Sequence, residues 1–176
     1  MKGIIAGGAT LILLAAPAYS QSITEKTGVN SALGITPTTQ DFITEVANSD
    51  MLEIQSSQLA ATKSDNKDGT FAKHMIKDHT ATSEKVKELV NSGKVKVHLP
   101  MAMDSAYQAK LDKLKGLNGK DFSKQYEDMQ VSAHKDAVSL FQRYSKGGNN
   151  ADLKAFASET LPTLQEHLKM AQDLEK

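Results

Sequence analysis

Apolar residues recur at steps of three and four along three long stretches of the chain, which is the spacing of one buried helical face. The face of the last stretch consists of Leu153, Ala157, Leu164, His167, Ala171 and Leu174, with Thr160 in register. An earlier stretch presents Phe71, Met75, His79, Thr82, Val86 and Leu89. The third presents Tyr126, Gln130, Ala133, Ala137, Phe141 and Tyr144, with His134 beside that face. Because an unpaired imidazole in a core is costly, we expect these three histidines to find one another or a metal.

The breaks between the periodic stretches set the helix boundaries. Helices are predicted over residues 40–62, 70–92, 104–115, 120–145 and 151–176, and Pro162 interrupts the last of them. Val95-Lys96-Val97-His98-Leu99 alternates like a strand but has no partner run elsewhere. Four long helices, two short turns and one long connection predict an all-α, ferritin-like four-helix bundle. The long crossover joins the second and fourth helices and carries the extra short helix.

The first twenty residues have the pattern of a secretory signal peptide. A basic start at Lys2 is followed by an apolar run over residues 4–14, and Ala18 and Ser20 form a small-residue exit. The run is too short for a transmembrane anchor, which needs ~20 apolar residues. We therefore expect cleavage between Ser20 and Gln21, a secreted, periplasmic protein, and no transmembrane anchor in the mature chain. Residues 21–36 are expected to form a flexible leader, and residues 37–176 the bundle domain.

Composition excludes several classes of function. The formal net charge is zero and Arg143 is the only arginine, so nothing favours binding to nucleic acid. There is no cysteine, which excludes thiolate chemistry and cysteine-ligated iron–sulfur clusters. No glycine-rich phosphate loop and no nucleophile elbow is present, so no catalytic residue is assigned.

Several motifs on the predicted helices resemble a known family. They are Phe42…Glu53, Phe71-Ala72…Met75…Asp78-His79, Phe122…Tyr126…His134, and Leu161-Pro162-Thr163-Leu164…His167-Leu168. Over about residues 40–174 the chain resembles the secreted bacterial family called domain of unknown function 4142. The resemblance implies a ferritin-like bundle in the periplasm or outer membrane, without an assigned activity. It also implies that the characteristic polar positions are Glu53, Asp78, His79, His134 and His167.

Distances along the helices test whether these polar positions can meet. At 1.5 Å per residue, Glu53 and His79 both lie ~14 Å from the predicted turn that joins their helices. His134 and His167 lie ~17 and ~24 Å from the turn of the second hairpin. These distances from the turns differ by about two helical turns at most. We therefore predict that the four side chains form one shared polar layer.

Such a layer would suit a transition metal, Cu, Zn or Fe. Imidazole and carboxylate ligands suit Zn, Cu(II) and Fe, whereas thioether ligands favour Cu(I). Met75 and Met170 lie at helical spacing from His79 and His167, which makes them softer candidates for copper. A di-iron carboxylate centre uses Glu-x-x-His motifs, which are absent from this chain, so ferroxidase or oxygenase chemistry is not favoured.

Two other interpretations remain open. The polar layer can be a purely structural network that fixes helix register, with His79 paired to Glu53, and His134 joined to His167 through water or Asp78. His74 and His98 are expected to be ordinary exposed residues. The protein can instead be a non-catalytic structural or interaction module of the envelope that binds an envelope protein partner. The sequence also leaves a homo-oligomer open.

Overall fold

The computed structural model describes residues 22, 28–64 and 66–176, and every regular element among them is a helix. The elements are α2 (Val29–Ala32), α3 (Thr39–Lys63), α4 (Asn66–Asn91), α5 (Ser105–Lys115), α6 (Gly119–Gly147) and α7 (Ala151–Leu174). The prediction of an all-α bundle is therefore confirmed, and residues 95–99 form no strand. The predicted signal peptide over residues 1–20 lies outside the described residues.

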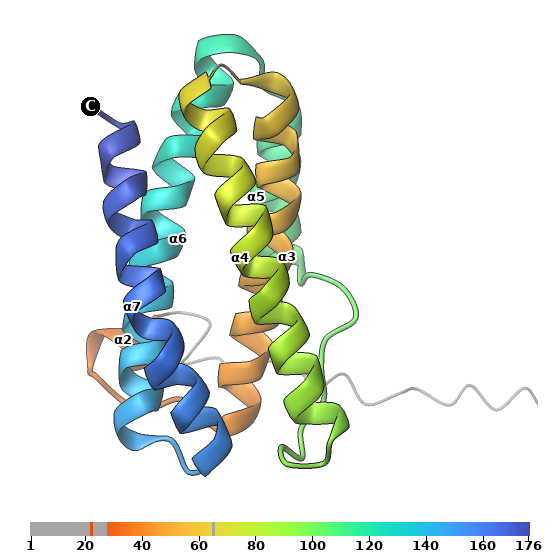
Figure 1. Ribbon diagram of the computed structural model, residues 1–176, viewed down its shortest axis with the longest axis vertical. Coiled ribbons are helices and arrows are strands. Elements are labelled where there is room, and N and C mark those ends of the chain that lie inside the picture. Colours follow the sequence, from red (N-terminus) through yellow and green to blue (C-terminus); the bar gives the residue numbers. More distant parts are fainter. Residues whose placement is uncertain (1–21, 23–27, 65) are drawn as a thin grey trace, which may run out of the picture.

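The four long helices form two hairpins that pack side by side. The turn between α3 and α4 lies at one end of the bundle and the turn between α6 and α7 at the other (Figure 1). Across the hairpins, α3 packs on α6 and α4 packs on α7. The predicted long crossover runs from α4 to α6 and carries α5, which packs against α3. Among the described residues, no helix combines the length and the apolar character that crossing a membrane requires.

Side chains that cap the first turns fix where several helices begin. The Thr38 side chain accepts a hydrogen bond from the backbone N–H of Asp41, and the Asn150 side chain accepts one from Leu153. The structure corrects one boundary, because α4 begins at Asn66 rather than near residue 70. Residues 66–69, which the sequence leaves between two predicted helices, form the first helical turn instead. Its acidic residue, Asp68, suits the positive end of the helix dipole.

Part of the segment that was expected to be a flexible leader packs on the bundle. Residues 29–32 form α2, and the Ser31 hydroxyl lies 2.9 Å from the hydroxyl of Ser139 on α6. The Arg143 guanidinium donates to the backbone carbonyl of Ile35 at 2.6 Å. Residues 28–36 therefore lie against α6 near the end of the bundle where α6 joins α7.

The core consists of two apolar clusters. One gathers aromatic residues around Phe42, whose ring stacks on Tyr144 with centroids 4.1 Å apart. The other surrounds Phe71 and Tyr126. On α4, α6 and α7 in turn, a buried histidine lies along the helix between residues of one cluster and residues of the other. The two clusters thus frame a polar layer near the middle of the bundle.

Candidate metal centre

Three buried imidazoles from three helices meet in this polar layer. His79 comes from α4, His134 from α6 and His167 from α7, and each is at most 3% exposed. Their ring centroids lie 5.6 Å (His79–His134), 5.5 Å (His79–His167) and 5.4 Å (His134–His167) apart. One ring nitrogen of each lies within 4.8 Å of one ring nitrogen of the other two. The three buried side chains therefore form a nearly equilateral triangle in the interior of the bundle.

One nitrogen of each ring has a hydrogen-bond partner outside the triangle. His79 Nδ1 lies 2.8 Å from Asp50 Oδ1 on α3, and His167 Nε2 lies 3.0 Å from Asp78 Oδ2 on α4. His134 Nδ1 donates to the backbone carbonyl of Gln130, 2.8 Å away and one turn earlier on α6. Carboxylate and carbonyl partners of this kind fix the orientation and tautomer of metal-ligating histidines.

The remaining ring nitrogens have no such partner. His79 Nε2, His134 Nε2 and His167 Nδ1 are buried and make no hydrogen bond within the described part of the chain. An unpaired polar atom in a core costs about 1–3 kcal/mol, so native interiors rarely tolerate three together. When the rings are neutral and protonated on the nitrogens that face the outer partners, these three nitrogens present lone pairs, which is the form that binds a metal.

Glu53 adds a carboxylate to the same layer from α3. Its side chain is 1% exposed, and neither carboxylate oxygen has a hydrogen-bond partner among the described residues. The Glu53 carboxylate favours the charged form of both His79 and His134, although burial outweighs this effect at His134 and lowers its pKa. The group of ligand atoms that all lie within 4.8 Å of one another contains only the three histidines. Glu53 thus stands beside the triangle, close enough to interact with two of its members.

Burial controls the protonation of two of the rings. It lowers the pKa of His134 below the usual value of a histidine. For His167, burial and the neighbouring His134 and His79 lower the pKa to about 4. These two imidazoles are therefore neutral near pH 7, and neutral imidazole is the form that coordinates metals.

The pKa of His79 is raised rather than lowered, because the Asp50 carboxylate lies beside its ring. Burial alone would lower the pKa of His79, but the hydrogen bond and the negative charge of Asp50 raise it above its usual value. The Asp50 carboxylate also accepts a hydrogen bond from the Ser83 hydroxyl at 3.1 Å. The Nδ1 proton of His79 is thereby held toward Asp50, and a metal at Nε2 would displace only the second proton.

The structure places the other residues that the sequence singled out around this triangle. Asp78 is partly exposed, with its side chain 24% accessible, and its hydrogen bond to the triangle is with His167. Met75 is fully buried, and Met170 is partly buried, in the apolar cluster around Phe71. The thioethers therefore belong to the packing of that cluster.

The structure corrects the pairing expected for a purely structural network. His79 pairs with Asp50 and not with Glu53. The expected contact of His167 with Asp78 is present, whereas the hydrogen bond of His134 goes to the Gln130 carbonyl. Sequence reasoning missed Asp50, although it precedes Glu53 by three residues and so shares its helical face. It also missed His74, whose Nε2 lies 3.1 Å from Asp78 Oδ2. The four-residue spacing of His74 and Asp78 was the available signal.

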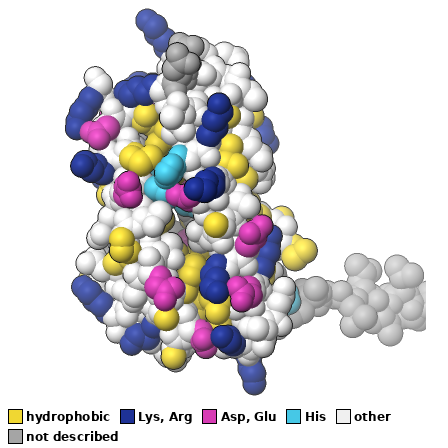
Figure 2. Space-filling model, in the orientation of Figure 1, with side chains coloured by type: hydrophobic (Ala, Val, Ile, Leu, Met, Phe, Trp, Pro, Cys, Tyr) yellow, Lys and Arg dark blue, Asp and Glu magenta, His cyan; other side chains and the backbone are white. Residues whose placement is uncertain are grey.

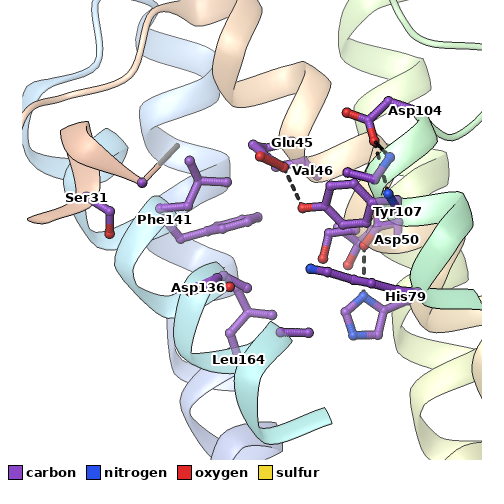
Figure 3. A pocket seen from close by; sticks show the side chains of 18 of the residues that line it. Ser31, Glu45, Val46, Asp50, His79, Asp104, Tyr107, Asp136, Phe141 and Leu164 are labelled. Carbon is purple, nitrogen blue, oxygen red and sulfur yellow. Dashed lines mark hydrogen bonds and ion pairs between the residues drawn. The ribbon is translucent and has the colours of Figure 1, made fainter. Parts of the chain in front are cut away.

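A partly open cavity of about 320 Å³ borders the polar layer on the side of His79 and Asp50. Figure 3 shows Asp50 and His79 at one end of the cavity, with Tyr107 and Glu45 beside them. The Tyr107 hydroxyl of α5 donates to the Glu45 carboxylate of α3 at 2.5 Å. The crossover helix therefore covers the outer partner of His79 and leaves a space next to it.

A comparison of the sequence with known protein families identifies the family of this chain. The family model described as Domain of unknown function (DUF4142) matches residues 24–174. No curated protein and no solved structure matches the chain. The match spans the whole bundle and every residue of the histidine triangle. The chain therefore belongs to the family of Domain of unknown function (DUF4142).

Proposed function

We propose that the protein binds one transition-metal ion tightly in the interior of its bundle. His79 Nε2, His134 Nε2 and His167 Nδ1 would be the nitrogen ligands, with Glu53 as the carboxylate ligand. The observation that carries this proposal is the pattern of hydrogen bonds. In each ring one nitrogen is fixed by an outer partner, and the other lies buried and unpartnered within the described chain.

The same pattern weighs against a purely structural network. A network that only fixes helix register gains stability by satisfying its polar atoms. Here three ring nitrogens and both oxygens of Glu53 lack partners among the described residues, while the outer nitrogens are all satisfied. A cation would compensate all of these atoms at once, because each of them can donate a lone pair and Glu53 supplies a negative charge.

The chemistry of the ligands limits the metal. Three imidazoles and one carboxylate suit Zn, Cu(II) or Fe, and the absence of thiolates disfavours the softest ions. Two antiparallel hairpins joined by a long crossover match ferritin-like connectivity, but a single carboxylate in the set differs from di-iron centres. We place Met75 and Met170 outside the ligand set, because both pack in the apolar cluster.

With Glu53 turned inward as a fourth ligand, the site would be closed and tetrahedral, which is typical of sites that hold a metal rather than react at it. We therefore propose a binding role and no catalysis. We also propose that the bundle acts in the periplasm after removal of residues 1–20, because their pattern is that of a signal peptide.

Metal binding can be measured on the purified mature chain. Metal-free protein is loaded with Zn(II), Cu(II) or Fe(II), exchanged into metal-free buffer, and analysed for bound metal and melting temperature. We expect at least one ion per chain to remain bound and to raise the melting temperature. His134→Ala should lose this ion, whereas His98→Ala, which changes an exposed histidine of the crossover, should keep it. A wild-type chain that retains no metal and shows no shift with any of the three ions would refute the proposal.

A further inference from the structure

A second group of ligand atoms adjoins the histidine triangle. The ring of His74, the carboxylate of Asp78 and the ring of His167 each offer an atom within 4.8 Å of the others. His74 Nε2 lies 3.1 Å, and His167 Nε2 lies 3.0 Å, from the same oxygen, Asp78 Oδ2. His167 therefore belongs to both groups and faces each of them with a different nitrogen, because its Nδ1 is the unpartnered atom in the interior.

This second group reaches the surface. The His74 side chain is 45% exposed, that of Asp78 is 24% exposed, and that of His167 is only 2% exposed. Figure 2 shows a histidine side chain at the surface where α4 and α7 lie side by side, next to acidic and hydrophobic side chains. A shallow hollow of about 270 Å³ beside it is lined by Thr70, Phe71, His74 and Met170, among others. From His74 through Asp78 to His167, the side chains of this group thus extend from the surface into the interior.

An orienting role for Asp78 accounts for only part of this arrangement. A carboxylate that fixes the tautomer of His167 needs one hydrogen bond, and Asp78 already makes it. His74 adds a second imidazole to the same oxygen, and its ring centroid lies 5.5 Å from that of His167. A surface His–Asp pair contributes little to stability, so stability gives little reason for this convergence.

The spacing fits coordination of a metal. Nitrogen and oxygen ligands lie ~2.0–2.2 Å from a zinc-like ion, so neighbouring ligands of a tetrahedral site are ~3.3–3.5 Å apart. The two contacts to Asp78 Oδ2 measure 3.0 and 3.1 Å, which is a few tenths of an ångström shorter. Small side-chain rotations at the exposed His74 and the partly exposed Asp78 would open the group enough to admit an ion.

We propose that His74, Asp78 and His167 bind a second transition-metal ion, and that the His167 imidazole bridges this ion to the interior one. This inference rests on the proposed interior site, because it shares His167 with it. Coordination of both ring nitrogens requires imidazolate. The second ion therefore takes the place of the Nε2 proton, which is released to solvent. Three protein ligands at a half-exposed position leave an open coordination position, which suits uptake or exchange of the ion.

Copper(II) is a suitable probe because it reports both stoichiometry and bridging. The mature protein, residues 21–176, is saturated with Cu(II) and freed of unbound ions. It is then studied by elemental analysis and electron paramagnetic resonance. The wild type and the control His98→Ala should hold two ions per chain, and His74→Ala should hold one. An imidazolate bridge couples the two spins, so the wild-type signal should integrate to fewer than two independent coppers. The His74→Ala signal should correspond to one uncoupled copper.

The outcomes separate the two proposals. One ion in both the wild type and His74→Ala would overturn the second site and leave the interior site standing. Two ions with a full, uncoupled signal would overturn the bridge. No ion in the wild type would overturn both proposals. His74 is exposed, so circular dichroism should show an unchanged fold for its alanine variant, and a loss of copper there reports ligand removal.

Discussion

His79 Nδ1 lies 2.8 Å from Asp50 Oδ1, and this buried pair joins α4 to α3 at the level of the histidine triangle. Asp50 is 3% exposed and His79 is 3% exposed, so solvent does not screen their interaction. The pair aims the second nitrogen of the ring at the other two histidines. Asp50 is therefore the residue on which the orientation of one proposed ligand depends.

Asp50→Asn tests this orienting role. The amide can still accept a hydrogen bond from His79, but it lacks the charge that strengthens the ring as a ligand. We expect the affinity for the interior metal to fall by about 10–100-fold, as found for outer-shell partners of metal-bound histidines. Isothermal titration with Zn(II) measures the change. Asp128→Asn, which alters a surface carboxylate paired with Lys124, is the matched control and should bind as the wild type does.

Glu53→Leu separates the metal site from a structural network. In metal-free protein Glu53 is a buried carboxylate without a hydrogen-bond partner among the described residues, so an apolar side chain of similar size removes an unfavourable group. We expect the metal-free variant to be more stable than the wild type by about 1–3 kcal/mol in urea unfolding. The same variant should gain less stability on adding metal. A clear loss of stability in the metal-free state would instead show that Glu53 supports the fold.

His167→Ala tests the contribution of the triangle to packing. The ring is 2% exposed, so its removal leaves a cavity between α7 and α4. We expect a loss of about 1–3 kcal/mol in the free energy of unfolding of metal-free protein, larger than for a surface change. Lys169→Ala changes an exposed residue of α7, two positions after His167. It should lower the free energy of unfolding much less. Equal effects of the two substitutions would contradict the burial of His167.

The histidine triangle should make the stability of metal-free protein depend on pH. The pKa of His134 is lowered in the folded state by burial, and that of His167 is lowered to about 4. Because the unfolded chain has histidine pKa values near ~6.5, it binds protons first as the pH falls from about 6.5 towards 4. His79 acts in the opposite direction, since Asp50 raises its pKa and its contribution is lost as the pH rises.

Asp50 acts in the same direction as His79, because burial raises its pKa. The contribution of His134 is therefore measured by urea unfolding of the wild type and His134→Leu at pH 7 and pH 5. In His134→Leu one of the two lowered groups is gone. The free energy of unfolding at pH 7 minus that at pH 5 should therefore be smaller in this variant than in the wild type, and an unchanged difference would show that His134 does not titrate in this range.

The sequence predicted the bundle and the three inward histidines because both follow from helical periodicity. It missed the partner of His79 because the predicted start of α4 was four residues too late. With α4 beginning at Asn66, His79 lies thirteen residues into its helix, and Asp50 lies thirteen residues before the end of α3 at Lys63. Both are then ~20 Å from the connecting turn, whereas Glu53 is ~15 Å from it.

The observed helix bounds also explain why His134 and His167, the two histidines of the second hairpin, meet. α6 continues to Gly147, so His134 lies ~20 Å from its turn and His167 ~24 Å, which is less than one helical turn of difference. His74 could not be assigned from periodicity, because it lies on the exposed side of α4. Its role depends on how closely α7 packs there, and a single-helix pattern does not contain that information.

Anomalous diffraction from crystals grown with Zn(II) or Cu(II) tests the interior metal site most directly. We expect an anomalous peak among His79 Nε2, His134 Nε2 and His167 Nδ1, at ~2.0–2.2 Å from each nitrogen, with Glu53 turned towards it. Data collected on both sides of the absorption edge would identify the ion. Well-ordered histidine rings around the triangle with no anomalous peak, under conditions where a surface histidine does bind the metal, would contradict the interior site.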